Sequence, residues 1–162
     1  MSEIKKYVQD LRSKSLKDRG SALDWINKHA KLVDCTVAIP ALIECLKDDH
    51  LSIRHMARKV LIELGKPTLP HLLEAMKCNN HHAKFQGGII IKALAEKGID
   101  CSVAVPTLKE ALKDESEYVQ LAAQLALKEI YAKQMCARPE KDKKFPEKNP
   151  PEKTPHKDRS KV

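Results

Sequence analysis

Two stretches of the chain decide its fold, because one nearly repeats the other. Residues Asp34–Asp49 read DCTVAIPALIECLKDD, and residues Asp100–Glu115 read DCSVAVPTLKEALKDE. Ten of the 16 aligned positions are identical, at an offset of 66 residues. Self-similarity at a fixed period is the sequence signature of repeat architectures. We therefore expect a chain in which one structural unit is used several times.

Two looser copies extend this pattern. Leu69–Lys77 (LPHLLEAMK) follows Ile39–Lys47 (IPALIECLK) at an offset of 30 residues. Leu16–Ile26 (LKDRGSALDWI) precedes Leu51–Leu61 (LSIRHMARKVL) at an offset of 35 residues. The first copy lacks the proline and is the most polar, as expected for a terminal repeat with one face in water. The sequence therefore predicts four units of roughly 30 to 36 residues each.

Each unit has the pattern of two helices. In the second unit, Pro40 falls in the first turn of one helix and Gly65 ends the next, with apolar residues at helical spacing between them. The same pattern predicts helices at residues 4–13, 17–30, 38–47, 51–64, 69–77, 82–97, 104–113 and 117–133. A single pair cannot bury its apolar faces, whereas stacked pairs share a continuous core. We expect an all-α solenoid of about four helix pairs over residues 1–134.

The end of the chain has a different composition. From Arg138 onward it holds five of the nine prolines, few apolar residues, nine Lys or Arg and five Asp or Glu. Such a segment cannot bury enough surface to offset the entropy lost on ordering. Residues 135–162 are therefore predicted to form a disordered, basic, proline-rich tail. The tail has two open interpretations: a solubilising segment, or an electrostatic tether to nucleic acid or an acidic partner.

Charge and cysteine content limit the setting of the protein without naming a partner. The formal net charge of +8 favours nucleic acid, acidic proteins or anionic surfaces, and does not choose among them. No apolar run approaches the ~18 residues of a membrane span, and the first residues do not resemble a signal peptide. Five cysteines, an odd number, favour a reducing compartment. We expect a cytoplasmic monomer that does not span a membrane.

The second unit resembles a known repeat. Residues Ala38–Gly65, AIPALIECLKDDHLSIRHMARKVLIELG, are similar to a HEAT repeat of the short bacterial type, also found in phycobilisome-lyase-like proteins. The resemblance rests on Ala-x-Pro-x-Leu-x-x-x-Leu-x-Asp, then Ile53-Arg54, Ala57 and a closing Leu-Gly. The fourth unit has Gln120 where arginine is usual, and the third has Cys78 for the aspartate and Lys84 for the arginine.

The resemblance implies a fold and a binding face. HEAT-like solenoids are right-handed α-α superhelices whose second helices line the concave side. Second-helix residues off the apolar stripe are then the predicted partner-binding residues: His55, Arg58, Lys59, Lys92 and Lys128. The irregular third unit adds Lys84 and Gly88, because Gly88 aligns with Arg58 and would leave room for a partner.

Arg19, Arg54 and Lys84 occupy equivalent places in three second helices. One interpretation is a basic ladder that binds phosphates or acidic partners. The other is structural: Arg54 bonds Asp48 or Asp49 and ties one unit to the next. The resemblance favours the structural role.

No catalytic, cofactor or metal motif stands out. The chain lacks a glycine-rich phosphate loop, a nucleophile elbow, CxxC and HExxH. Cys78, His81 and His82 are residue types that zinc prefers, but their spacing fits no closed four-ligand site. We therefore predict no enzyme activity, no cofactor and no metal.

Three functions follow as hypotheses. The first is a non-catalytic scaffold or adaptor that binds a protein partner on the concave face. The second is a nucleic-acid-associated protein that uses basic second helices and the tail. The third is a regulatory or lyase-type subunit of a larger enzyme.

Overall fold

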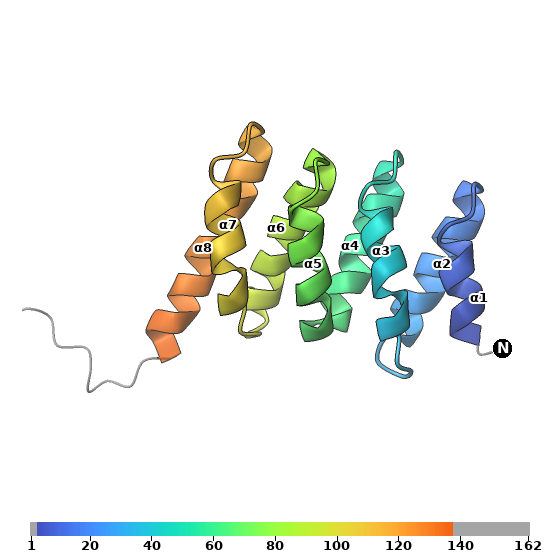
Figure 1. Ribbon diagram of the computed structural model, residues 1–162. Helices are drawn as coiled ribbons and strands as arrows, with labels where there is room; N and C mark the ends of the chain where they lie inside the picture. The colour runs from blue at the N-terminus through green and yellow to red at the C-terminus, as the bar shows by residue number, and fades with distance from the viewer. Residues whose placement is uncertain (1–2, 138–162) are drawn as a thin grey trace, which may run out of the picture.

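The computed structural model describes residues 3–137, which form eight α-helices, three short 3-10 turns and no strand (Figure 1). The prediction of an all-α chain is confirmed for this part of the protein. The α-helices are α1 (Glu3–Asp10), α2 (Leu16–His29), α3 (Ile39–Cys45), α4 (Leu51–Leu64), α5 (Leu69–Met76), α6 (His81–Glu96), α7 (Val105–Ala111) and α8 (Glu117–Ala137). The predicted tail lies outside the described residues, except for residues 135–137.

The helix boundaries lie within three residues of those expected from the sequence, with one exception. The α8 helix runs to Ala137, four residues past its predicted end at 133. Gln134, Met135 and Ala137 are residue types that are compatible with a helix. The last turn of the helix thus takes in the first three residues assigned to the tail.

The helices stand side by side in two layers, with α1, α3, α5 and α7 in one layer and α2, α4, α6 and α8 in the other (Figure 1). Consecutive helices pack in four pairs, which we call units one to four, and each second helix also packs on the second helix of the next unit. Of these second-helix contacts, α6 with α8 is the most extensive and α4 with α6 the sparsest. No helix within residues 3–137 is both long enough and apolar enough to cross a membrane.

The core is aliphatic, as the low aromatic content of the chain indicates. Its largest fully buried side chains are leucine and isoleucine from both layers, among them Leu23, Leu42, Leu61, Ile91 and Leu108. Burial of each such side chain contributes about 1.5–3 kcal/mol to folding. Cys35 and Cys101, at equivalent positions of the two near-identical stretches, are buried among them.

The near-identical stretches also share their turns. Each has an aspartate at its first and fifteenth positions, and each of these aspartates accepts a backbone N–H two residues further on at 2.9–3.0 Å, in the pairs Asp34–Thr36, Asp48–His50, Asp100–Ser102 and Asp114–Ser116. Such side-chain bonds fix a turn before a helix. At the end of α4, Gly65 has a φ of 75°, a conformation that favours glycine, and it ends the helix as predicted.

The sole tryptophan lies in unit one. Trp25 is half-buried and stacks between Tyr7 and His29, with ring centroids 4.2 and 4.1 Å away. It therefore fills space between α1 and α2 in the first unit.

Candidate interaction surface

Each second helix turns one side away from the core, and the repeat offsets align these sides. We call the outward-facing sides of α2, α4, α6 and α8 the second-helix face. One row of equivalent positions on it is Gly20, His55, Phe85 and Leu121, and the next row, one turn along, is Asp24, Lys59, Ile89 and Leu125. Because residues three and four apart share one side of a helix, these rows lie next to each other. The face is thus polar in units one and two and apolar in units three and four.

The structure places three of the predicted binding residues together on α4. His55 and Lys59 are exposed, and Arg58 is half-buried. With Met56, Ile62 and Glu63 they line a shallow hollow of about 430 Å³. Arg58 also donates to Gln86 Oε1 of α6 at 3.3 Å, so it joins units two and three as well as lining the hollow.

Two further predicted residues lie on the same face. Lys92 of α6 is half-buried and forms an ion pair with Glu96, one turn further along the helix. Lys128 of α8 occupies the equivalent place in unit four and is exposed. These two lysines therefore lie at matching positions, one turn beyond the second row.

Lys84 does not have the role expected of a binding residue. Its ammonium group lies 2.5 Å from Asp114 Oδ2, and the two side chains are only 18% and 7% exposed. Burial by itself would raise the pKa of Asp114, but hydrogen bonds from Lys84, from the Ser116 N–H and from His81 hold it below its usual value. Lys84 thus joins unit three to unit four.

Gly88 is also not an opening for a partner. It is buried, and a Cβ placed on it would lie 2.9 Å from Ala122 Cβ and 3.2 Å from the Ala122 carbonyl carbon. Real Cβ atoms essentially never approach closer than 3.0 Å. Glycine at this position allows α6 and α8 to approach closely, which corrects the expectation of free space. Gly87 is similarly tight, at 2.8 Å from Met76 Cγ.

The remaining members of the predicted basic ladder are structural. Arg54 donates to the carbonyls of Asp48 and Asp49 at 2.5 and 2.9 Å, within the turn of its own unit. Gln120, where arginine is usual, donates to the carbonyl of Asp114 at 2.7 Å in the same way. The bond from Arg54 to these residues is as predicted, but it does not run between units.

Two inter-unit ion pairs use the aspartates at equivalent positions of the repeated stretch. Arg19 Nε lies 2.7 Å from Asp48 Oδ2, which joins unit one to unit two as Lys84 and Asp114 join three to four. At the middle junction the equivalent of Asp48 is Cys78, which cannot accept an ion pair from Arg54. That junction is bridged instead by the bond from Arg58 to Gln86 and, near the other end of α4, by Lys97, which donates to Glu63 at 3.1 Å.

The apolar part of the second-helix face was not predicted from the sequence. Phe85 and Tyr118 meet edge to face, with centroids 6.5 Å apart at 80°. Tyr118 and Leu121 are 74% and 50% exposed, and Ile89 and Leu125 are half-exposed. We call these five residues the apolar patch. The signal was present in the row alignment, in which Phe85 and Leu121 stand where unit two has His55.

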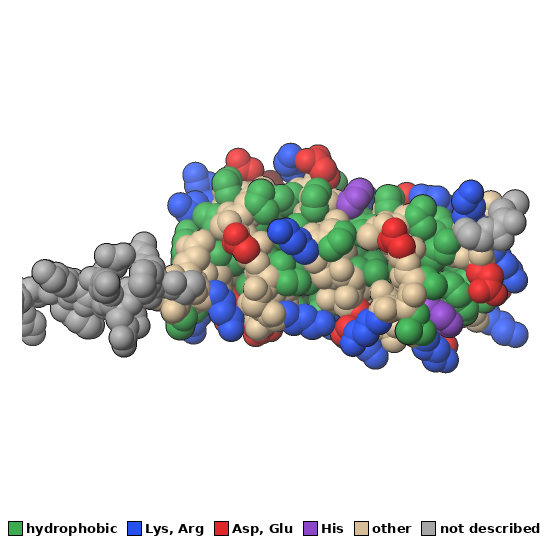
Figure 2. Space-filling view, turned by 90° about the horizontal axis from the view of Figure 1, so that it is seen from below, with side chains coloured by type: hydrophobic (Ala, Val, Ile, Leu, Met, Phe, Trp, Pro, Cys, Tyr) green, Lys and Arg blue, Asp and Glu red, His purple; other side chains and the backbone are tan. Residues whose placement is uncertain are grey.

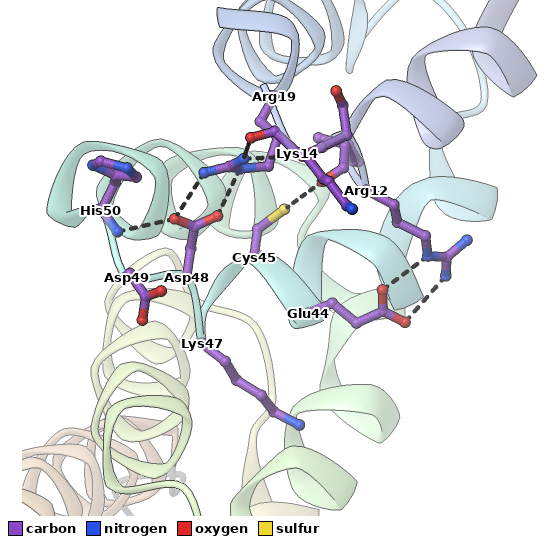
Figure 3. Close-up of a pocket in the computed structure, with 11 residues that line it drawn as sticks. Arg12, Lys14, Arg19, Glu44, Cys45, Lys47, Asp48, Asp49 and His50 are labelled. Carbon is purple, nitrogen blue, oxygen red and sulfur yellow. Dashed lines mark hydrogen bonds and ion pairs between the residues drawn. The ribbon is translucent and has the colours of Figure 1, made fainter. Parts of the chain in front are cut away.

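A second hollow lies on the side of the inter-helix turns (Figure 3). It measures about 660 Å³ and is lined by charged groups, with Arg12 bonded to Glu44 at 2.8 and 3.1 Å and Arg19 reaching Asp48. The Cys45 thiol donates to the Leu11 carbonyl at 3.7 Å. Burial raises its pKa to about 12, so this thiol stays protonated and is a poor nucleophile at neutral pH.

Metal-ligand side chains do not cluster in the part of the chain that the structure describes. No three His, Cys, Asp or Glu side chains between residues 3 and 137 lie where they could hold an ion together. His81 lies near Asp114 instead, with Nδ1 3.3 Å from Oδ1.

Comparison with known proteins adds no relative: no family model matches the chain, and no curated protein matches it.

Proposed function

We propose that the protein is a HEAT-like solenoid, a right-handed superhelix of four helix pairs, that acts as a non-catalytic scaffold or adaptor. Its second-helix face binds a segment of a partner protein. The observation that carries this proposal is the outward exposure of Tyr118, Leu121 and their neighbours on α6 and α8. Contiguous apolar side chains on a surface mark interaction sites, because their exposure to water is unfavourable.

The repeat explains why this face is available for binding. The layer of first helices and the contacts between second helices are used for the core. The outward positions of the second helices do not pack in the core. Their residues therefore differ between units, while the residues at buried positions stay alike. Unequal residues at equivalent outward positions are what a specific site on a repeat scaffold requires.

The charge distribution favours protein over nucleic acid as the partner. Figure 2, which presents the side of the molecule where the lower helix ends and turns lie, shows Lys and Arg side chains interspersed with carboxylates and apolar groups. Arg19 and Lys84, two members of the supposed basic ladder, are paired with carboxylates. Phosphate-backbone binding depends on cations that remain available to phosphates.

A crosslinking experiment tests the proposed function. A photoreactive amino acid is placed at His55 on the second-helix face and, as a control, at the exposed Val37 on the turn before α3, and the full chain is illuminated in source lysate. We expect protein crosslinks from His55 and not from Val37. Equal crosslinking from both positions would contradict the proposal.

Nucleic acid is tested separately. The full chain and a chain lacking residues 138–162 are titrated with random DNA and RNA across a salt series. Salt-sensitive binding by both forms would replace the scaffold hypothesis with the nucleic-acid hypothesis. Binding lost with the tail would assign the contact to the tail and leave the face to a protein.

A further inference from the structure

We propose that the apolar patch on α6 and α8 takes an acidic amphipathic helix, laid along the two helices as a third helix would pack. This inference rests on the proposed function and names the chemistry of the partner. It depends on the shape of the patch, on its border charges and on the way in which Gly88 brings the two helices together.

The shape of the patch suits a helix. Phe85 and Ile89 are one turn apart on α6, and Leu121 and Leu125 are one turn apart on α8, so the four side chains form two parallel pairs. The close contact of Gly88 with Ala122 holds α6 and α8 side by side beneath them. An amphipathic helix places apolar anchors at i, i+3, i+4 and i+7, a spacing that fits two such rows. An added strand has no partner edge, because residues 3–137 contain no strand.

The composition of the patch favours a protein helix over single-stranded nucleic acid as its ligand. Bases stack on aromatic rings. Three of the five patch residues, Ile89, Leu121 and Leu125, are aliphatic, and the two rings meet edge to face rather than standing open as parallel platforms. Aliphatic side chains gain most from contact with other aliphatic side chains.

The charged residues at the border of the patch indicate the sign of the partner's charge. One turn beyond the patch on its C-terminal side lie Lys92 and Lys128, and the neighbouring α4 adds the exposed Lys59. On the N-terminal side, one turn back, lie His82 and Glu117. Lys92 is paired with Glu96, whereas no carboxylate within the described residues lies at ion-pair distance from Lys59 or Lys128. Carboxylates beside the apolar stripe of a partner would meet these two lysines. Such rim charges set specificity and the rate of association.

A peptide selection tests the inference. A phage-displayed library of random peptides of about 16 residues, four helical turns, is selected against the full chain, and enriched peptides are synthesised and titrated by fluorescence anisotropy. We expect enriched peptides with net negative charge and apolar residues at i, i+3, i+4 and i+7. Their affinity should fall at least about tenfold in the double variant Tyr118→Gln, Leu121→Gln, as for loss of central interface residues.

Matched variants control for folding and for general charge. Leu51→Gln changes a leucine of similar exposure elsewhere, 59% against 50% for Leu121, and should leave affinity unchanged. Lys128→Glu should weaken binding of the acidic peptides, and this loss of affinity should grow as the salt concentration falls. Lys109→Glu on α7 should not change the affinity. Circular dichroism verifies the helical content of every variant.

The other outcomes overturn the inference in distinguishable ways. Peptides that are basic, or that bind the double variant as well as the wild type and lose affinity in Lys59→Ala, would refute the acidic helix while keeping a protein-binding face. Failure to enrich any peptide above background would refute the inference and count against the proposed function, which the crosslinks from His55 then decide. A dimer of the full chain that dissociates in the double variant, measured by light scattering, would assign the patch to a second copy instead.

Discussion

The junction between units one and two and the junction between units three and four use the same ion pair but differ in closeness. In both, a cation at the start of a second helix reaches the aspartate of the next unit, Arg19 to Asp48 and Lys84 to Asp114. Only at the later junction does a buried glycine, Gly88, let the second helices approach closely. The ion pair thus sets the register between units, and the small residue sets their separation.

Filling the glycine should have the largest effect. Gly88→Val places side-chain carbons where Ala122 already lies, so we expect a loss of about 2–3 kcal/mol of unfolding free energy, as for overpacking of a core. Gly20→Ala is the control, because a Cβ there meets nothing within 4 Å. It should stabilise the protein by about 0.5–1 kcal/mol through helix propensity. Urea titrations of both variants measure the difference, and equal effects would contradict the close approach of α6 and α8.

Removing the charge of the shared ion pair should have the next largest effect. Asp114→Asn keeps an acceptor for the Ser116 N–H but leaves the Lys84 ammonium without its carboxylate. We expect a loss of about 1–2 kcal/mol, since the pair is mostly buried. The control Asp24→Asn breaks the exposed pair with Lys28 and should change stability by less than about 0.5 kcal/mol. Thermal or urea unfolding measures the stability of both variants. Similar losses in the two would contradict a special contribution of the buried pair to stability.

Supplying the missing aspartate at the middle junction should increase the unfolding free energy, by less than the two losses above. Cys78→Asp places a carboxylate at the position of Asp48 and Asp114, where Arg54 is the equivalent cation. We expect a gain of about 0.5–1 kcal/mol from a half-exposed pair. The gain should vanish in an Arg54→Met background, which a double-mutant cycle of unfolding free energies measures. A gain that persists without Arg54 would have another origin.

The smallest expected effect is the pH dependence of the stability that Asp114 contributes. The pKa of Asp114 lies below its ordinary value of 3.8 in the folded protein. The carboxylate therefore stabilises the fold fully above pH 3.8, and this contribution is lost as the pH falls through the folded pKa. The stability difference between wild type and Asp114→Asn should narrow between pH 6 and about pH 3. Urea midpoints at several pH values measure it, and a constant difference would argue against ionisation of Asp114 as the cause.

The sequence predicted local features well and inter-unit features poorly. Helix positions follow from Pro40, Gly65 and the apolar spacing, all of which act within a few residues. The partner of Lys84 is 30 residues away, and only the orientation of two units decides that it reaches Asp114 and not a ligand. Gly88 was misjudged for the same reason, because its alignment with Arg58 carries no information about the distance to α8.

The candidate site was predicted only in its polar half. His55, Lys59, Lys92 and Lys128 do lie on the second-helix face, because helical periodicity alone places them there. The apolar half was overlooked because exposed Leu121 and buried leucines look alike in a sequence. Comparison of equivalent outward positions between units separates them, since a position that is polar in one unit is not required by the core.

The uneven junctions also determine how the molecule would respond to bending. The middle junction has the sparsest contact between second helices and lacks the ion pair at the Cys78 end. It is bridged by Arg58 to Gln86 and, at the other end of α4, by Lys97 to Glu63. We therefore expect this junction to be the most compliant joint of the molecule, between the block of units one and two and the block of units three and four. A partner that spans both blocks would change the curvature of the molecule at this joint before it strained either block.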